Sequence, residues 1–354
     1  MKSTSGSYYE TLDHVRAFAV FSVFTWHFIH VNYGQINGPA FFPLSQLYEG
    51  HTGVAIFMAL TGYLFAKLLD NREVLWLPFI WNRVLRLGPL LSVVIVVFAL
   101  VRVFEGRPLD YYFKSILEGF IFPTWPNGGW SITVELHFYF LLPLIWFLKS
   151  VIRQTLWLIL LAMLMLSGCL YIERGDVQFV SYFTIMGRID QFVLGILAFQ
   201  NRAFFAGRHL FAVGVALAFA GFWWVFDSLG GFYRMPGNQP PTPLWIVIPT
   251  IEGAVYGSLI AWYDNSFALK STRFSQFVAS IGTCSYSMYL WHYFVVFRAA
   301  RLIDRSVIGL TDPMVTIPMA ALCFLLLQPF CYLSYTFIES PLLALRVKYL
   351  RPRM

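Results

Sequence analysis

The chain has 354 residues, of which 58% are hydrophobic and only 12% are charged. A soluble domain carries about 25% charged residues, so this composition excludes an ordinary soluble protein and predicts a membrane protein. The net charge of +7 does not indicate nucleic-acid binding, because the basic residues are scattered between apolar stretches and form no stripe. No soluble insert separates the apolar stretches, and we therefore expect one domain.

Apolar stretches of membrane-spanning length follow one another along the whole chain. They predict an all-α fold, a polytopic membrane bundle of about ten transmembrane helices. The expected spans are 15–32, 52–69, 89–104, 131–148, 155–172, 180–200, 210–227, 244–263, 281–298 and 313–337.

The distribution of Lys and Arg sets the expected orientation, since cytoplasmic loops are enriched in basic residues. With ten spans, most of the basic residues fall on the side of the N-terminus, and both termini are expected in the cytoplasm. Arg298, Arg301 and Arg305 are the main exception, because this topology places them outside. The first apolar stretch has no small-residue cleavage pattern after it, so we expect it to remain as a span.

Three further features lie between or beside the spans. Residues 76–87 are amphipathic and are expected along the cytoplasmic interface, with the third span beginning at Gly88 and Pro89. Residues 227–243 are rich in glycine and proline and predict an irregular, outward-facing loop. The four cysteines have no metal-ligand spacing, so we expect buried free thiols and no metal site.

The first span contains the most informative residue, His27, because a titratable side chain is costly in hydrocarbon. Arg16 precedes it by eleven positions, which places both side chains on one helix face, about 16 Å apart along the axis. A neutral imidazole can remove a proton from an attacking hydroxyl or accept an acyl group itself. The alternative is a structural histidine that is hydrogen-bonded to a neighbouring helix.

Arg83 and Arg86 are spaced i, i+3 and share a helix face. Two guanidinium groups at a membrane surface suit phosphate or pyrophosphate, which they bind in a bidentate manner. The alternative is a pair of topology signals that contact lipid headgroups.

Three other candidate polar side chains lie near or inside apolar stretches. Glu135 follows a glycine pair, which permits close backbone approach to a ligand, and can orient a sugar hydroxyl or a histidine. Its alternative is a hydrated carboxylate at an ordinary helix entry. For Arg188, the alternative is a buried ion pair, either with Asp190 or with a residue of another helix. For His292, the alternative is an interfacial histidine beside a tryptophan.

The order of these motifs resembles that of the acyltransferase-3 family of membrane acyltransferases, over roughly residues 10–345. The resemblance begins with Arg16 and His27, which match the family's arginine, ten residues, histidine pattern. It continues through Gly53–Leu64, Asn82–Leu90, Trp130–Tyr139, Arg188–Gly195, Ser285–His292 and Phe337–Pro341. The chain departs from the family at Ala55, Leu136 and Ser340, where acidic residues and an arginine are usual. Residues 1–9 and 346–354 are left as short cytoplasmic tails.

The resemblance implies transfer of an acyl group, with acetyl expected, from acyl-CoA to a hydroxyl of an exopolysaccharide or another cell-surface glycan. It implies catalytic roles for His27, Arg16 and Glu135, and donor binding by Arg83 and Arg86. Binding of the substrate falls to Trp130, Arg188 and His292. No permanently bound cofactor is expected, since acyl-CoA is the donor substrate.

The resemblance also implies a bacterial cytoplasmic (inner) membrane as the location. Many family members carry an extra periplasmic domain, whereas this chain is expected to be a stand-alone membrane domain. Its expected partners are the lipid bilayer, acyl-CoA and a carbohydrate acceptor, with no nucleic acid; the oligomeric state is open, a homodimer included. Alternatives are transfer of succinyl or another acyl group, N-acylation, and a transporter or exporter of glycan, which also places polar residues at the midplane.

Overall fold

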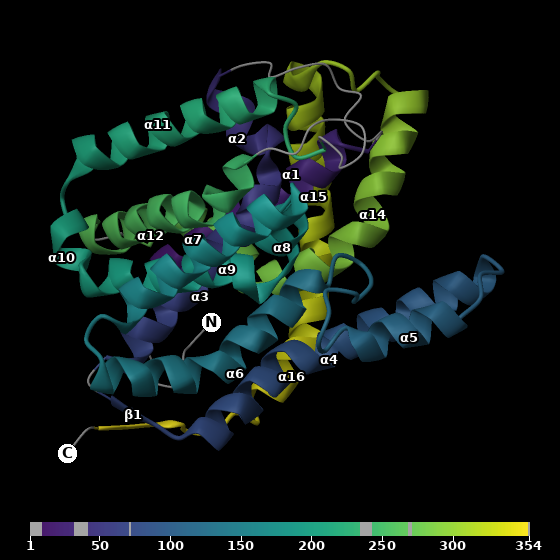
Figure 1. Cartoon of the computed structure of the whole chain (residues 1–354). Helices are drawn as coiled ribbons and strands as arrows, with labels where there is room; N and C mark the ends of the chain where they lie inside the picture. The colour runs from purple at the N-terminus through teal and green to yellow at the C-terminus, as the bar shows by residue number, and fades with distance from the viewer. Residues whose placement is uncertain (1–8, 32–41, 71, 234–242, 268–270, 353–354) are drawn as a thin grey trace.

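The computed structural model describes residues 9–31, 42–70, 72–233, 243–267 and 271–352, and this part of the chain is almost wholly helical, as predicted (Figure 1). The long helices are α1 (Glu10–Ile29), α3 (Gly53–Leu69), α4 (Trp76–Phe104), α6 (Trp130–Val151), α7 (Thr155–Arg174), α9 (Ile185–Gln200), α11 (His209–Ser228), α12 (Ile248–Ser266), α14 (Ser285–Ser306) and α15 (Pro313–Ser334).

Shorter elements connect the long helices. The short α-helices are α2 (Ser45–Tyr48), α5 (Asp110–Glu118), α8 (Gln178–Phe183), α10 (Arg202–Phe205), α13 (Arg273–Thr283) and α16 (Ser340–Leu343). Tighter or wider turns form η1 (Phe42–Leu44), η2 (Gly50–Thr52), η3 (Pro243–Ile246) and η4 (Tyr335–Glu339). Two strands, β1 (Arg72–Val74) and β2 (Leu350–Pro352), pair in antiparallel register, and Figure 1 shows β1 at the end of the bundle opposite α2.

A long helix covers or overlaps each of the ten expected spans. Six helical stretches of the described chain are long and apolar enough to cross a membrane: Gly50–Leu69, Trp76–Phe104, Trp130–Val151, Thr155–Arg174, His209–Ser228 and Pro313–Leu343. The others are shorter or carry more polar residues, as α9 does with its 16 residues. The number of ten crossings and the side of the termini therefore stay predictions.

The centre of the bundle consists of α1, α3, α9 and α12, and glycines bring these helices into backbone contact. A Cβ on Gly62 of α3 would lie 1.9 Å from the Phe192 carbonyl oxygen of α9. A Cβ on Gly195 of α9 would lie 2.0 Å from the Ala59 carbonyl oxygen. Small residues permit such close approach, which replaces the hydrophobic driving force that is missing between helices in lipid.

The predicted boundary between an interfacial segment and the third span is wrong. Residues 76–87 and the span form the single 29-residue helix α4, with Pro89 inside it. Proline is tolerated inside membrane helices, because neighbouring groups satisfy the backbone that it disrupts. At about 1.5 Å per residue α4 is longer than the ~30 Å hydrocarbon layer, so one end extends past that layer. Arg83 and Arg86 are consequently fixed on a continuous helix.

The expectations for the cysteines and for the loop 227–243 agree with the structure only in part. All four cysteines are free, as predicted, but only Cys284 and Cys331 are buried. Cys169 is exposed because α7 presents most of its surface outwards. The predicted loop 227–243 begins inside α11 and ends in η3, and its residues 234–242 lie outside the described residues.

Candidate active site

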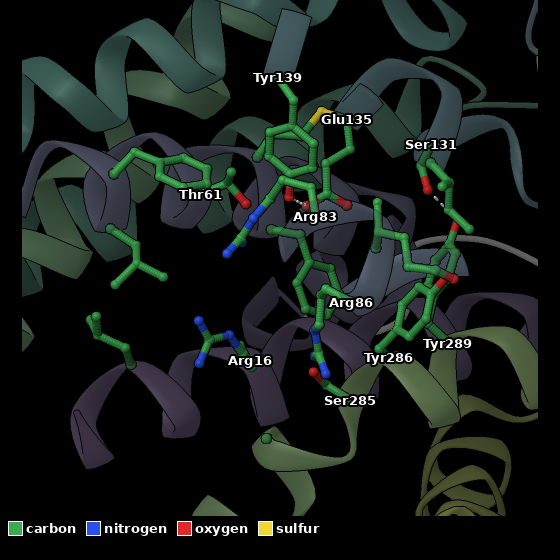
Figure 2. A pocket seen from close by; sticks show the side chains of 18 of the residues that line it. Arg16, Thr61, Arg83, Arg86, Ser131, Glu135, Tyr139, Ser285, Tyr286 and Tyr289 are labelled. Carbon is green, nitrogen blue, oxygen red and sulfur yellow. Dashed lines mark hydrogen bonds between the residues drawn. The ribbon is translucent and has the colours of Figure 1, made fainter. Parts of the chain in front are cut away.

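A cavity of about 200 Å³ opens between α1, α3, α4, α6 and α14 (Figure 2). Its polar lining includes four guanidinium groups, from Arg16, Arg83, Arg86 and Arg346, and only two carboxylates. The remaining wall is mostly apolar or aromatic, with Leu12, Val54, Phe57, Met58, Leu64, Phe65, Ile132, Tyr139, Phe192, Tyr286 and Tyr289. We name this space the arginine cavity; its excess of positive charge favours an anionic ligand.

The arginines of the cavity are held in different ways. Arg16 is paired with Asp13 one turn earlier on α1. Arg86 donates to the Glu339 carboxylate at 2.8 Å, and that carboxylate accepts from a serine hydroxyl at 2.5 Å. The Arg83 guanidinium lies over the rings of Phe65, Phe79 and Tyr139, at 5.4, 5.5 and 5.7 Å. Carboxylate pairs and aromatic rings thus position three guanidinium groups towards one space, as Figure 2 shows for Arg16, Arg83 and Arg86.

Glu135 lies in the arginine cavity rather than beside His27. Its carboxylate accepts a hydrogen bond from the Tyr139 hydroxyl one turn further along α6. Ser131, which also lines the cavity, pairs its hydroxyl with the Tyr289 hydroxyl at 2.6 Å. Helix α6 begins at Trp130, with Gly129 as its cap residue, so Ser131 lies inside the first turn.

The two remaining candidate histidines meet each other away from the arginine cavity. His27 lies near the far end of α1, with its ring centroid 5.1 Å from that of His292 on α14. The rings of Tyr293 and Phe297, which also belong to α14, lie 5.7 and 5.5 Å from the His27 ring. The sequence prediction that Arg16 and His27 share one helix is confirmed.

The hydrogen bond of His292 fixes its tautomer. Its Nδ1 lies 2.5 Å from the Tyr289 carbonyl oxygen, and because a carbonyl only accepts, Nδ1 carries the proton and donates. The neutral ring therefore keeps a lone pair on Nε2, which is buried and has no hydrogen-bond partner among the described residues. A buried nitrogen lone pair beside a second imidazole is suited to proton transfer.

Tyr289 connects the arginine cavity to these histidines. Its ring lines the cavity, and its hydroxyl donates to the Gly128 carbonyl oxygen at 2.7 Å. Its ring centroid also lies 5.7 Å from that of His292. Tyr289 therefore contacts both the arginine cavity and the histidine pair.

Trp130 and Arg188 form a third group. The Arg188 guanidinium lies 5.7 Å from the Trp130 ring and 4.3 Å from the Tyr182 ring. It is almost fully buried and pairs with Glu252 of α12 at 3.1 Å. The alternative of a buried pair across helices therefore describes Arg188, whereas Asp190 accepts from a threonine hydroxyl at 2.5 Å. A role in substrate binding stays a prediction.

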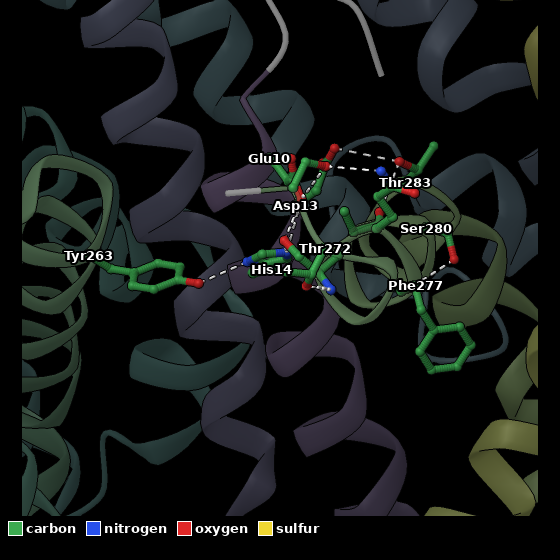
Figure 3. Close-up of polar contacts among 12 residues, drawn as sticks. Glu10, Asp13, His14, Tyr263, Thr272, Phe277, Ser280 and Thr283 are labelled. Atoms are coloured by element: carbon green, nitrogen blue, oxygen red, sulfur yellow. Dashed lines mark hydrogen bonds and ion pairs between the residues drawn. The ribbon is translucent and has the colours of Figure 1, made fainter. Parts of the chain in front are cut away.

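His14, on the same helix as His27, has a different environment (Figure 3). Its Nε2 lies 2.9 Å from the Ser275 carbonyl oxygen and donates to it, so Nδ1 accepts from the Tyr263 hydroxyl at 2.8 Å. Both ring nitrogens are occupied, and the side chain ties α1 to α12 and to α13. His14 is a structural histidine.

Sequence reasoning missed several residues of these groups. Glu252 was detectable by the rule used for His27, since it is a carboxylate within an apolar stretch. Glu339 lies in the Phe337–Pro341 motif, and its expected pairing with an arginine is confirmed by Arg86. Tyr139 and Tyr289 lie inside quoted motifs but were not singled out as site residues, because aromatic residues are abundant throughout the chain. Among the described residues, no group of three His, Cys, Asp or Glu side chains can hold a metal ion.

Comparison with known proteins agrees with the class that the fold and the cavities define, a polytopic membrane protein with buried polar centres. The acyltransferase domain family matches residues 9–336, so the chain belongs to the acyltransferase-3 family. The chain is 26% identical to the peptidoglycan O-acetyltransferase OatA of Listeria monocytogenes, over 96% of this chain and 56% of that protein.

Two further relatives have similar scores. The O-acetyltransferase OatA of Staphylococcus aureus is 25% identical, over 96% of this chain and 58% of that protein. The putative peptidoglycan O-acetyltransferase YrhL of Bacillus subtilis is 25% identical, over 96% of this chain and 56% of that protein. The chain thus spans somewhat more than half the length of these relatives. No solved structure matches it significantly.

Proposed function

We propose that this protein is an integral-membrane O-acyltransferase that moves an acetyl group from cytoplasmic acetyl-CoA to a hydroxyl of a cell-surface glycan. The observation that carries the proposal is the arrangement of α1, with an arginine-lined cavity at one end and a histidine pair at the other. The names of the relatives, which are O-acetyltransferases and in two cases peptidoglycan O-acetyltransferases, support a glycan acceptor. The bacterial cytoplasmic membrane is the proposed location.

The donor binds with its phosphates in the arginine cavity. Arg83 and Arg86 supply planar guanidinium groups, which bind phosphate oxygens in pairs. Arg86 has five N–H donors and can keep its bond to Glu339 while it contacts a phosphate. The pantetheine arm then extends along the apolar wall of α3 past Tyr289, over the ~16 Å that separate Arg16 from His27 on α1.

The reaction takes place at His27. The acceptor hydroxyl gives its proton to the imidazole while its oxygen attacks the thioester carbonyl carbon. The carbon–sulfur bond then breaks, and the imidazolium returns the proton to the departing thiolate, so that the products are the acetyl ester and CoA. His292 supports His27 with the lone pair on its Nε2. Glu135 and Arg16 line the arginine cavity and contribute to catalysis from the side on which the donor binds.

The acceptor approaches from the end of α1 that is away from the arginine cavity. Trp130 offers an aromatic face of the kind that packs against sugar rings, and Arg188 holds Trp130 and Tyr182 in place through ring contacts. This assignment makes Arg188 a positioning residue for the glycan.

The test is release of free CoA by the purified protein in lipid nanodiscs, with acetyl-CoA as donor and soluble peptidoglycan or exopolysaccharide fragments as acceptors. The proposal expects CoA release that depends on an acceptor and a labelled acetyl group on the glycan. Transport of the fragment across a sealed vesicle without acetylation would instead identify a transporter and overturn the proposal.

A further inference from the structure

The segment that follows α16 lies outside residues 9–336, which the family matches, and sequence analysis left residues 346–354 as a tail. The structure instead packs residues 346–352 against the start of α4. We name these residues the C-terminal strap. Two of them, Arg346 and Tyr349, line the arginine cavity together with Arg83 and Arg86.

The strap is fixed to α4 by its backbone. The fully buried Asn82 donates through Nδ2 to the Val347 carbonyl oxygen at 2.8 Å, and its Oδ1 accepts from the Val347 N–H at 3.0 Å. The Leu75 N–H donates to the Tyr349 carbonyl oxygen at 2.8 Å. Because Asn82 directly precedes Arg83, the same turn of α4 holds the strap and carries a cavity arginine.

The strap adds a fourth guanidinium group to the three that Arg16, Arg83 and Arg86 bring to the arginine cavity. Arg346 is half-buried, and burial together with the guanidinium groups of Arg83 and Arg86 lowers its pKa from the usual value. An arginine keeps its charge in proteins, and the Arg346 Nε–H donates to the Leu343 carbonyl oxygen at 2.9 Å, which fixes the side chain at the cavity. With Arg346, four guanidinium groups and only two carboxylates line the arginine cavity, and this excess of positive charge favours a ligand with several negative charges.

We infer that the C-terminal strap is part of the donor site and that Arg346 binds a phosphate group of acyl-CoA. The inference rests on the proposed function, because acyl-CoA is the proposed donor. Its nucleotide end carries a diphosphate and a separate phosphate, which together offer more anionic oxygens than Arg83 and Arg86 can pair. Asn82 is a positioning residue that acts through the strap.

The experiment measures CoA binding to the full chain by calorimetry in nanodiscs. Arg346→Gln should weaken binding by roughly tenfold or more, since one charged hydrogen bond is lost. Arg346→Lys should restore part of the loss, because lysine keeps the charge but lacks the planar fork. The matched control is Lys348→Gln, which removes the same charge from an exposed position of the strap and should bind CoA as the wild type does.

Asn82→Asp tests the positioning role, because aspartate accepts from the Val347 N–H but cannot donate to its carbonyl oxygen. Its effect on CoA binding should not add to that of Arg346→Gln in the double variant, since both remove the same contact. Additive losses, or equal losses for Arg346→Gln and Lys348→Gln, would overturn the inference. Thermal unfolding and elution volume identify any variant that has lost its fold. If Arg346→Gln is such a variant, the CoA affinity of Arg346→Lys decides whether Arg346 binds the donor.

Anionic lipid headgroups share the chemistry of the donor phosphates, so binding is measured in zwitterionic and in anionic nanodiscs. An equal loss of affinity in both assigns Arg346 to the donor. A loss confined to anionic nanodiscs would assign it to headgroups and refute the inference. If the wild type binds no CoA in either kind of nanodisc, the proposed function itself fails. If the wild type binds CoA and Arg346→Gln binds it equally well, the proposed function stands and only the role of the C-terminal strap is refuted.

Discussion

Replacing His27 with alanine should abolish turnover while the protein stays folded. The contacts of the His27 ring within the described residues are with the rings of Trp26, His292, Tyr293 and Phe297. Loss of such ring contacts costs about 0.5–1.5 kcal/mol of stability each at most. Loss of a general base lowers the rate by about 10²–10⁴-fold, which corresponds to roughly 2.7–5.4 kcal/mol of activation free energy.

His14→Ala is the matched control, because the same residue type is removed from the same helix. It deletes two hydrogen bonds, to Tyr263 and to the Ser275 carbonyl, and leaves those partners to find others. At about 1 kcal/mol for each bond, the free energy of unfolding should fall by roughly 2 kcal/mol. The rate of acetyl transfer should change little, since His14 bonds to α12 and α13 and does not line the arginine cavity.

The assay follows CoA release at saturating donor and acceptor, and thermal unfolding in the same nanodiscs gives stability. The two variants should differ in the property that they lose: His27→Ala loses activity but not stability, and His14→Ala loses stability but little activity. If His27→Ala kept turnover within tenfold of the wild type, the histidine pair would not be the reaction centre. His292→Asn would then be the next variant, since its amide keeps the donor to Tyr289 and removes the Nε2 lone pair.

Three other outcomes are expected. Arg83→Ala and Arg86→Ala should each raise the donor KM roughly 10–150-fold with little change in the acceptor KM, and Arg86→Lys should rescue only in part; unchanged KM values in steady-state assays would exclude a donor role. Cysteines introduced near both chain ends should resist labelling by an impermeant maleimide in intact cells, and labelling of either end would refute the proposed topology. Gly62→Ala should destabilise the bundle by about 1–3 kcal/mol or more, because its Cβ would meet a carbonyl oxygen of α9, whereas Gly168→Ala has open space and should leave thermal unfolding unchanged.

The helices of this fold were predictable because each depends on a local run of apolar residues. That Arg16 and His27 belong to one helix also followed from the first apolar stretch alone. The start of α4 was mispredicted at Gly88 and Pro89, because proline usually marks a helix boundary in soluble proteins. In a membrane the backbone must stay hydrogen-bonded, which favours a continuous helix through the proline.

The partners of the candidate residues were not predictable from one sequence. Arg86 meets Glu339 across 253 positions, and Arg188 meets Glu252 across 64. Such contacts depend on how the helices pack, and the apolar pattern of each helix leaves its neighbours open. For the same reason Glu135 was expected near a histidine or a sugar, and the structure places it among arginines.

The separation of the two polar centres has a physical reason. A guanidinium cluster and a neutral imidazole that has to accept a proton are poor neighbours, since nearby positive charge favours the unprotonated ring and weakens it as a base. Three turns of α1 between Arg16 and His27 keep the arginines away from the histidine pair, while one rigid helix keeps their distance constant. Tyr289 lies between the two centres: its ring lines the arginine cavity and contacts His292, and its hydroxyl donates to the Gly128 carbonyl oxygen. In the proposed reaction, the donor's charged end remains with the arginines and only its uncharged thioester reaches the imidazoles, so each centre works in the electrostatic environment that its chemistry requires.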